Sequence, residues 1–569
     1  MLLVVVDRGQ AEYAIVERSL LRALEHFGMG YRLLDLAEGP LSSEDGADAC
    51  CLVMAQEGLG ASLSGEAARV VRKWVEEDGL GLVSFDHRLS AYAPPLRVLL
   101  SGTAGDLSYA QAQGVRIADS AHFITRTYED GEERALFAPV ELACLPSPRR
   151  DEVGLVSDTK GRPALRVARP GRGRIVQFLV SPRMWDEGHL GHFQGLDGLL
   201  WRSIAWAARK PFAMLMFPPF VTCRIDDANG SANIFGKRSD SANRGFAYLR
   251  TLRQHGYIPN VGLFIDDITD GDVRAIKEAH DGKTAQFSPH AFTDPENINA
   301  HPIYMLHDGR EFSPKELKAN FARVDRKLAE WGITQAATIN AHFGEVGRNA
   351  VPFLVKRGVR FTMDPGVLLG STWAHAAEGA SRDWNPWPYG HHGFNYDVVP
   401  GCPELFNAVA HPVGRYKLHE QGMGTSDFLW WKTTFWEESP FNDIDGAAEK
   451  GAQILKLGLD GGFFGCLMTH EQRIATLSLS EWEQVLDSID RLTSRWDKTF
   501  ASYDHIAEYA RCKHRTRLVE ARLEGKKLRL RLVGEATLPL SAYVFWDESG
   551  EYRIERIPPF DGETEVVVG

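Results

Sequence analysis

Acidic and histidine residues follow several of the predicted strands, at the points where those strands end. Asp226 and Asp227 end the stretch VTCRIDD, and His290 ends FSPH. Asp294 follows His290 by four residues, and His470 ends CLMTH. Carboxylates and imidazoles together can hold a divalent metal through three protein ligands, with one position left for water. A base and an acid outside that ligand set would complete a metal-dependent hydrolase.

Each of these features also has a structural alternative. The side chains of neighbouring residues on a regular strand face opposite sides. Where the strand turns into a loop, however, the side chains of both Asp226 and Asp227 can reach the same site. The same pair could instead cap a helix. His290 could be a hydrogen-bonded loop histidine, and His470 a buried histidine beside Glu471. The metal site therefore depends on the segments converging in space.

The central region alternates strand-like and helix-like segments, which positions these residues. Helices are expected at 243–255, 314–331 and 348–357, and strands at 221–226, 260–265, 284–288, 336–341, 359–363 and 462–469. Six or more such units predict a closed or nearly closed (β/α) barrel, in which chemistry takes place at the C-terminal ends of the strands.

Two further domains flank this region. Apolar runs at 2–6, 51–54 and 80–85 alternate with helix-like segments, which predicts a flavodoxin-like parallel sheet in an α/β domain. After residue 512 short apolar–polar alternations predict a small antiparallel, β-sandwich-like module. The expected domains are thus 1–212, 213–512 and 513–569.

Composition excludes several classes of protein. The chain has 569 residues and a formal net charge of −12, so it lacks the basic excess typical of nucleic-acid binders. Its apolar runs are too short to span a bilayer. Seven cysteines without a CxxC pair, and a start at Met1 without a basic leader, lead us to expect a cytoplasmic protein. The oligomeric state is left open.

Residues 217–512 resemble the polysaccharide deacetylases with a NodB-type barrel. The family's paired acids match Asp226-Asp227, and its second motif matches His290 with Asp294. Its third motif corresponds to NAHFG at 340–344, and its last to LMTH, which ends at His470. Four motifs in this order imply a hydrolase that removes N- or O-linked acetyl groups from a carbohydrate or polysaccharide.

The resemblance also implies roles for individual residues. Asp227, His290 and Asp294 would hold a divalent metal, zinc, which lowers the pKa of bound water to about 7. Asp226 would act as the base and His470 as the acid that protonates the leaving group. The expected contacts with the carbohydrate substrate are Asn340, His342, Phe343 and Trp384.

Several positions depart from the family pattern. Asp294 stands where a second metal-binding histidine is usual, and Asn340 stands where an arginine orients the base. His342 replaces a proline and could be an extra ligand or a substrate contact. The family's acid-and-tryptophan motif could be filled by Asp364 or by Asp383-Trp384.

The first 200 residues resemble glutamine-amidotransferase-like domains of the trehalose-utilisation type, most closely in the ending GRGRIVQFLVSPRMW. The strand at 80–85 runs into Asp86-His87-Arg88 without the family's nucleophilic cysteine, so we expect a non-catalytic domain.

Two other functions stay open. Asp226 or Asp227 with Glu345 could form the carboxylate pair of a metal-independent glycoside hydrolase. A non-catalytic carbohydrate-binding or assembly protein with a decayed site is the other alternative.

Overall fold

The computed structural model describes residues 1–105, 107–145, 152–186, 188–236, 238–294, 297–306, 309–363, 368, 396–408, 427–429, 432–433 and 442–569. The chain forms two compact units. Unit 1 comprises Met1–Phe217, Asp460–Gly462 and Cys512–Gly569, and unit 2 comprises Pro218–Leu459 and Phe463–Arg511. Within these ranges no helix is long and apolar enough to cross a membrane.

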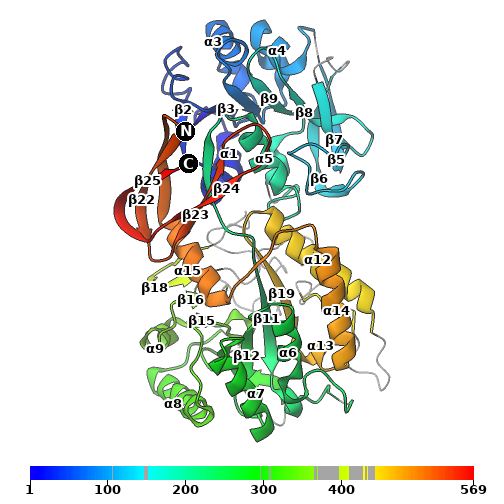
Figure 1. Ribbon diagram of the computed structural model, residues 1–569, viewed down its shortest axis with the longest axis vertical. Helices are drawn as coiled ribbons and strands as arrows, with labels where there is room; N and C mark the ends of the chain where they lie inside the picture. Colours follow the sequence, from blue (N-terminus) through cyan, green and yellow to red (C-terminus); the bar gives the residue numbers. More distant parts are fainter. Residues whose placement is uncertain are drawn as a thin grey trace. The chain divides into compact units, whose positions relative to one another are not determined.

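Unit 1 contains a nine-stranded mixed sheet in the order β2-β1-β3-β4-β9-β8-β7-β5-β6 (Figure 1). The first five strands are parallel: β2 (Tyr31–Asp35), β1 (Leu2–Val6), β3 (Cys51–Met54), β4 (Gly81–Ser84) and β9 (Arg174–Phe178). This is the strand order of flavodoxin-like folds, so the predicted parallel sheet is confirmed. The other four are antiparallel and were not predicted: β8 (Pro163–Ala168), β7 (Glu152–Asp158), β5 (Ser108–Ile117) and β6 (Glu133–Cys144).

The helices of this sheet follow from local sequence signals. Helix α3 (Gly65–Glu76) begins after Ser64, whose side chain accepts a hydrogen bond from the Ala67 amide. Helix α4 (Pro94–Ser101) begins with proline, whose fixed φ suits a first turn. Every residue of α5 (Asp197–Ala207) is buried.

The C-terminal segment adds antiparallel strands to unit 1. One sheet joins β10 (Phe212–Met216), β23 (Leu540–Phe545) and β24 (Arg553–Ile557), and another joins β21 (Thr516–Glu524), β22 (Lys527–Ala536) and β25 (Phe560–Val568). Along β22, Leu528, Leu530 and Leu532 are buried and alternate with charged residues, as the period of a strand requires.

Unit 2 contains two sheets. The larger joins β11 (Phe220–Ala228), β12 (Asn260–Phe264), β13 (Gln286–Asp294) and β19 (Phe464–His470) in parallel, with β14 (Asn297–His301) antiparallel at one edge and the short β20 (Thr499–Phe500) beside β11. The smaller joins β15 (Thr338–Ile339), β16 (Phe361–Thr362), β18 (Cys402–Asn407) and β17 (Asp397–Val399).

The two sheets of unit 2 adjoin where β15 lies beside β13. The amide of Ala336 donates to the carbonyl of Phe287 at 2.7 Å, and the amide of Asn340 donates to Oγ of Ser288 at 2.8 Å. The strands of the described ranges thus form an α/β arrangement, but the closed barrel that we predicted is not confirmed among them.

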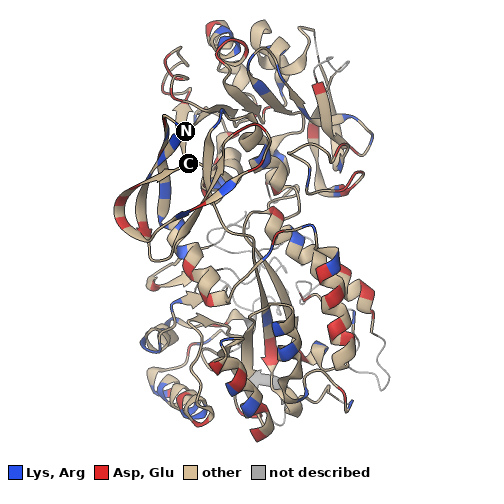
Figure 2. Cartoon of the chain, viewed as in Figure 1, with Lys and Arg blue, Asp and Glu red and all other residues tan. Residues whose placement is uncertain are grey.

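Helices surround these sheets: α6 (Ala247–Gln254), α7 (Asp270–Asp281), α8 (Pro314–Trp331), α9 (Val351–Lys356), α12 (Ile444–Asp460), α13 (Glu471–Ile474), α14 (Leu479–Leu492) and α15 (Tyr503–His514). Capping boxes start α7, α8 and α14, in which a Thr or Ser and an acid three residues later satisfy each other's amides. Helix α8 has the predicted bounds, and Lys, Arg, Asp and Glu are interspersed along it (Figure 2). It buries Leu317, Phe321, Val324, Leu328 and Trp331.

Candidate metal centre

A bulge near the end of β11 brings two consecutive carboxylates to one place. The pairing with β12 runs Ile225↔Val261 and then Ala228↔Leu263, so β11 contains one extra residue at this point. Asp227 has a φ of 55°, in the left-handed region that Asp tolerates better than most residues. The strand therefore departs from strict alternation at the position where Asp226 and Asp227 would otherwise face opposite sides.

Asp227, His290 and His342 form a group of three potential metal ligands. One donor atom from each lies within 4.8 Å of the other two. Nε2 of His290 lies 3.1 Å, and Nε2 of His342 3.7 Å, from Oδ1 of Asp227. The two imidazole rings meet edge to face with centroids 5.1 Å apart, and both contact the ring of Phe264.

The hydrogen bonding of His290 shows that these residues fit a cation. Nδ1 of His290 lies 2.8 Å from the main-chain carbonyl of Asn340, which can only accept, so Nδ1 carries the proton. In the neutral ring Nε2 then presents a lone pair to the buried Oδ1 of Asp227, which has no well-formed hydrogen bond within the described residues. A cation between these two acceptors removes their repulsion, and a carboxylate with two imidazoles is a ligand set suited to zinc.

A glycine on the neighbouring strand leaves space for this arrangement. A Cβ added at Gly262 of β12 would lie 2.6 Å from Nδ1 of His290 and 3.0 Å from Nδ2 of Asn340. Any larger residue would push one of these side chains aside. The arrangement of His290 and Asn340 therefore requires glycine at position 262.

Asp226 is held in place by a cation and an amide. Nε and Nη2 of Arg224 donate to its two carboxylate oxygens at 2.8 and 2.6 Å, and Nδ2 of Asn340 donates to Oδ1 at 2.8 Å. Burial alone would raise the pKa of Asp226, but Arg224, His290 and His470 outweigh burial and lower the pKa to about 2. The carboxylate is therefore ionised at neutral pH.

His470 is paired with a buried carboxylate. Nδ1 of His470 lies 2.7 Å from Oδ2 of Asp427, which also accepts the His470 amide at 3.1 Å. Burial lowers the pKa of His470, but the hydrogen bond to Asp427 and the charges of Asp227, Asp427 and Asp226 raise it to about 9. The imidazole is thus protonated at neutral pH and can donate a proton.

The structure brings five of the sequence-predicted site residues into contact with this centre. Asp226, Asp227, His290, Asn340 and His342 are joined by the distances above. Asn340, which we expected to contact the substrate, uses its amide on Asp226 and its carbonyl on His290.

Three sequence-predicted residues cannot be placed. Asp294 ends β13, but its side chain lies outside the described residues. The same holds for the side chain of Phe343, and Trp384 lies wholly outside the described ranges. The metal-ligand role of Asp294 and the substrate contacts of Phe343 and Trp384 therefore stay predictions.

Sequence reasoning missed two residues of this centre. Arg224 is two residues before Asp226, and side chains at that spacing share one face of a strand. Asp427 lies 43 residues before His470, and nothing in its local sequence marks it as the partner of that histidine.

Comparisons with known proteins give little further support. No family model and no curated protein matches the chain. Among solved structures, a proposed polysaccharide deacetylase from Mycobacterium smegmatis is 12% identical, covers 53% of this chain and 94% of its own, and has a TM-score of 0.32. A proposed glycoside hydrolase/deacetylase from Parabacteroides distasonis is 10% identical, with 61% and 86% covered and a TM-score of 0.29.

Another solved structure is similarly distant. A proposed GMP synthase protein from Thermoplasma acidophilum is 12% identical, covers 36% of this chain and 92% of its own, and has a TM-score of 0.23. Similarities at these scores carry no argument about fold or activity, which rest on the geometry described above.

Proposed function

We propose that unit 2 is a metal-dependent hydrolase that removes an N- or O-linked acetyl group from a carbohydrate. The observation that carries the proposal is the cluster of Asp227, His290 and His342. The ionised Asp226 precedes Asp227 on β11, and the protonated His470 lies opposite Asp226 in the register of β11 and β19. Together these residues supply a ligand set, a base and an acid.

Each residue has a distinct task. A bound divalent metal, for which zinc is the best fit, would make water nucleophilic at neutral pH and polarise the carbonyl of the substrate. Asp226, oriented by Arg224 and Asn340, accepts the proton of the water. His470, oriented by Asp427, donates a proton to the departing amine or alcohol. A base and an acid of this kind each contribute about 10²–10⁴-fold to the rate.

The substrate class comes from the sequence motifs. Their order along residues 217–512 resembles that of polysaccharide deacetylases, which indicates an acetylated sugar rather than a peptide or a lipid ester.

The glycoside-hydrolase alternative is less well supported. A glycosidase needs one carboxylic acid with a raised pKa to protonate the leaving oxygen. The pKa of Asp226 and that of Asp227 are both lowered by neighbouring cations and histidines, despite the opposing effect of burial. Neither of these two carboxyl groups could serve as that acid, so in this alternative the acid would have to be the buried Glu345.

The test combines metal analysis with product analysis. Purified full-length protein should contain about one divalent metal per chain, release acetate from acetylated chito-oligosaccharides or acetylated xylan, and lose this activity on chelation. Cleavage of the glycan without acetate release, unaffected by chelator, would establish the alternative instead.

Asp427→Asn should shift the alkaline side of the pH profile. The hydrogen bond to Asp427 is the largest of the effects that raise the pKa of His470, and the proton-donating form is present below that pKa and lost above it. Removing the negative charge of Asp427 lowers the pKa of His470, so kcat/KM should begin to fall at a pH lower by about one unit or more. The measurement is kcat/KM for acetate release against pH.

Asp445, an exposed acid on α12, offers a matched control. Asp445→Asn should leave the profile unchanged. An unchanged alkaline side in Asp427→Asn would mean that another group donates the proton.

Arg224→Met should impair both stability and catalysis. It leaves the buried carboxylate of Asp226 without its cation, which costs about 3–5 kcal/mol of stability, and it raises the pKa of Asp226, so activity is lost at a higher pH on the acid side. Arg224→Lys should restore only part of the rate, because an ammonium cannot make the two-point contact. Urea unfolding and the acid side of the kcat/KM profile provide the measurements.

The double variant Arg224→Met/Asp226→Asn separates the two effects. It removes both charges, so it should recover much of the lost stability while remaining inactive. Additive losses of stability in the double variant would show that the two residues are not coupled.

A further inference from the structure

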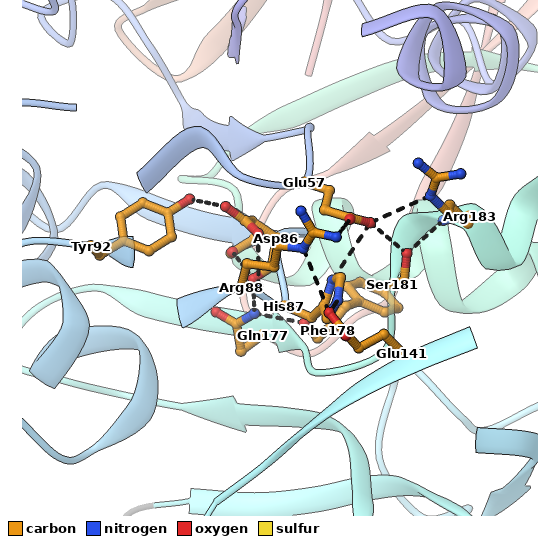
Figure 3. Close-up of polar contacts among 11 residues, drawn as sticks. Glu57, Asp86, His87, Arg88, Tyr92, Glu141, Gln177, Phe178, Ser181 and Arg183 are labelled. Atoms are coloured by element: carbon orange, nitrogen blue, oxygen red, sulfur yellow. Dashed lines mark hydrogen bonds and ion pairs between the residues drawn. The ribbon is translucent and has the colours of Figure 1, made fainter. Parts of the chain in front are cut away.

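A second group of polar residues lies in unit 1, at the carboxyl ends of the parallel strands (Figure 3). Glu57 follows β3, His87 and Arg88 follow β4, and Ser181 and Arg183 follow β9. Ligands of open α/β sheets bind outside the carboxyl ends of the strands. We call Glu57, His87, Arg88, Ser181 and Arg183, together with Glu141 of β6, the strand-end cluster.

Glu57 is the buried centre of the strand-end cluster. Its side chain is 4% exposed. Nη2 of Arg88 lies 2.6 Å from its Oε1, Oγ of Ser181 donates to its Oε2 at 2.8 Å, and Nε of Arg183 lies 3.7 Å from Oε2. Arg88 and Arg183 are 48% and 41% exposed. The cluster therefore reaches from the interior to solvent.

The turn that carries His87 is rigidly held. Oδ2 of the neighbouring Asp86 accepts from Tyr92 at 2.7 Å, and its main-chain carbonyl accepts from Gln177 at 2.9 Å (Figure 3). The imidazole is therefore fixed in position before any ligand arrives.

His87 has a ring nitrogen without a hydrogen bond. The side chain is fully buried, and Nε2 lies 2.9 Å from Oε1 of Glu141. Because a carboxylate accepts, Nε2 carries the proton and Nδ1 of the neutral ring is an acceptor. Nδ1 has no hydrogen bond from the described residues and lies 3.9 Å from Oε2 of Glu57. Both groups are buried, and the half-exposed side chains of Arg88 and Arg183, which contact Glu57, are the parts of the cluster that a ligand meets first.

The charges of the cluster favour a neutral ligand. Two carboxylates, Glu57 and Glu141, are balanced by two guanidinium groups, Arg88 and Arg183. The arginines oppose a bound cation, and the carboxylates oppose a phosphate or carboxylate ligand. A mixture of charged donors and acceptors instead matches the hydroxyl groups of a sugar, which both donate and accept.

An exposed aromatic ring lies beside these groups. Tyr109 of β5 is 36% exposed, and its ring lies edge to face with that of His87, with centroids 6.3 Å apart. In the register of β5 and β6, Glu141 lies opposite Gln111, two residues from Tyr109, so Tyr109 and Glu141 share a face. A phenol ring next to hydrogen-bonding groups provides the apolar contact that the C–H face of a sugar ring uses.

We propose that the strand-end cluster, with Tyr109, binds a neutral sugar or related polyol. The proposal concerns unit 1 alone and does not depend on the metal centre or on hydrolysis. It would give a binding role to a domain that lacks a nucleophilic cysteine after β4.

The test is ligand binding by the full-length protein, measured by saturation-transfer NMR and calorimetry with D-glucose, maltose and, as a charged comparison, inorganic phosphate. The neutral sugars should bind saturably, and phosphate should not compete. Arg183→Gln and Glu141→Gln should each weaken sugar binding about tenfold or more, because each removes a charged hydrogen-bonding partner. Tyr109→Ala should weaken it as well.

Arg116→Gln is the matched control, since Arg116 is 54% exposed and pairs with Glu133 elsewhere in the same sheet. It should bind as the wild type does. Thermal unfolding of each variant shows whether it has kept its fold. If Glu141→Gln is unstable, the test still rests on Arg183→Gln, which removes only a 3.7 Å ion pair. Failure of the neutral sugars to bind, or equal affinity in wild type and Arg183→Gln, would overturn the proposal.

Discussion

His290→Ala is expected to yield a protein without stoichiometric metal and without hydrolytic activity. The substitution removes one of three donor atoms that lie within 4.8 Å of one another, and it also removes the ring fixed by the Asn340 carbonyl. Loss of a partner that only orients a ligand already costs about 10–100-fold in metal affinity, so loss of the ligand itself should cost more. Elemental analysis and competition with a chromogenic chelator measure the effect.

His255 provides the control for this experiment. It is a partly buried histidine of unit 2 whose Nδ1 lies 2.7 Å from Asp490, so it too pairs with a carboxylate, but outside the centre. His255→Ala should retain the metal. Full metal content in His290→Ala would contradict the proposed ligand set, whatever the substrate is.

Asp226→Asn should retain the metal while kcat falls by about 10²–10⁴-fold, the usual contribution of a general base. Asparagine has almost the same volume, and Asp227, His290 and His342 are unchanged, so the loss should appear in the chemical step. Single-turnover acetate release together with metal analysis separates the two effects.

The chain offers a close match for the Arg224–Asp226 pair. Arg238 and Asp240 have the same two-residue spacing and the same two-point contact, at 2.9 and 3.0 Å, but lie exposed. Asp240→Asn should leave kcat unchanged. A fully active, metal-loaded Asp226→Asn protein would show that another residue takes the proton.

The parts of the fold that the sequence predicted well are those with strong local signals. The continuous apolar runs of β1, β3 and β4 indicated buried parallel strands, and the capping box at Ser313 fixed the start of α8. The antiparallel strands β5 and β6 were missed because one face of each is largely exposed, β5 has no apolar run, and Pro139 interrupts the apolar stretch of β6. In unit 2, the strands expected at 336–341 and 359–363 are present as β15 and β16, but each has only two residues, so the sequence predicted their positions and overestimated their lengths.

The same distinction between local and distant signals holds for the centre. Asp226 and Asp227 are adjacent, so the chemistry of the pair could be inferred from the sequence. His342 contacts Asp227 across more than a hundred residues, and Asp427 pairs with His470 across 43. Which of several acids and histidines converge is decided by strand register and by the bulge in β11, and neither is visible in composition or spacing.

The left-handed backbone of Asp227 has a consequence for the evolution of this protein. A non-glycine residue in this region of φ/ψ space is strained by about 1–3 kcal/mol. Glycine would relieve that strain and would remove a buried carboxylate from among its neighbours. The lowered pKa of Asp227 shows, however, that its neighbours stabilise the ionised carboxylate, so a change to glycine is opposed by the lost contacts and the lost reaction and not by the backbone.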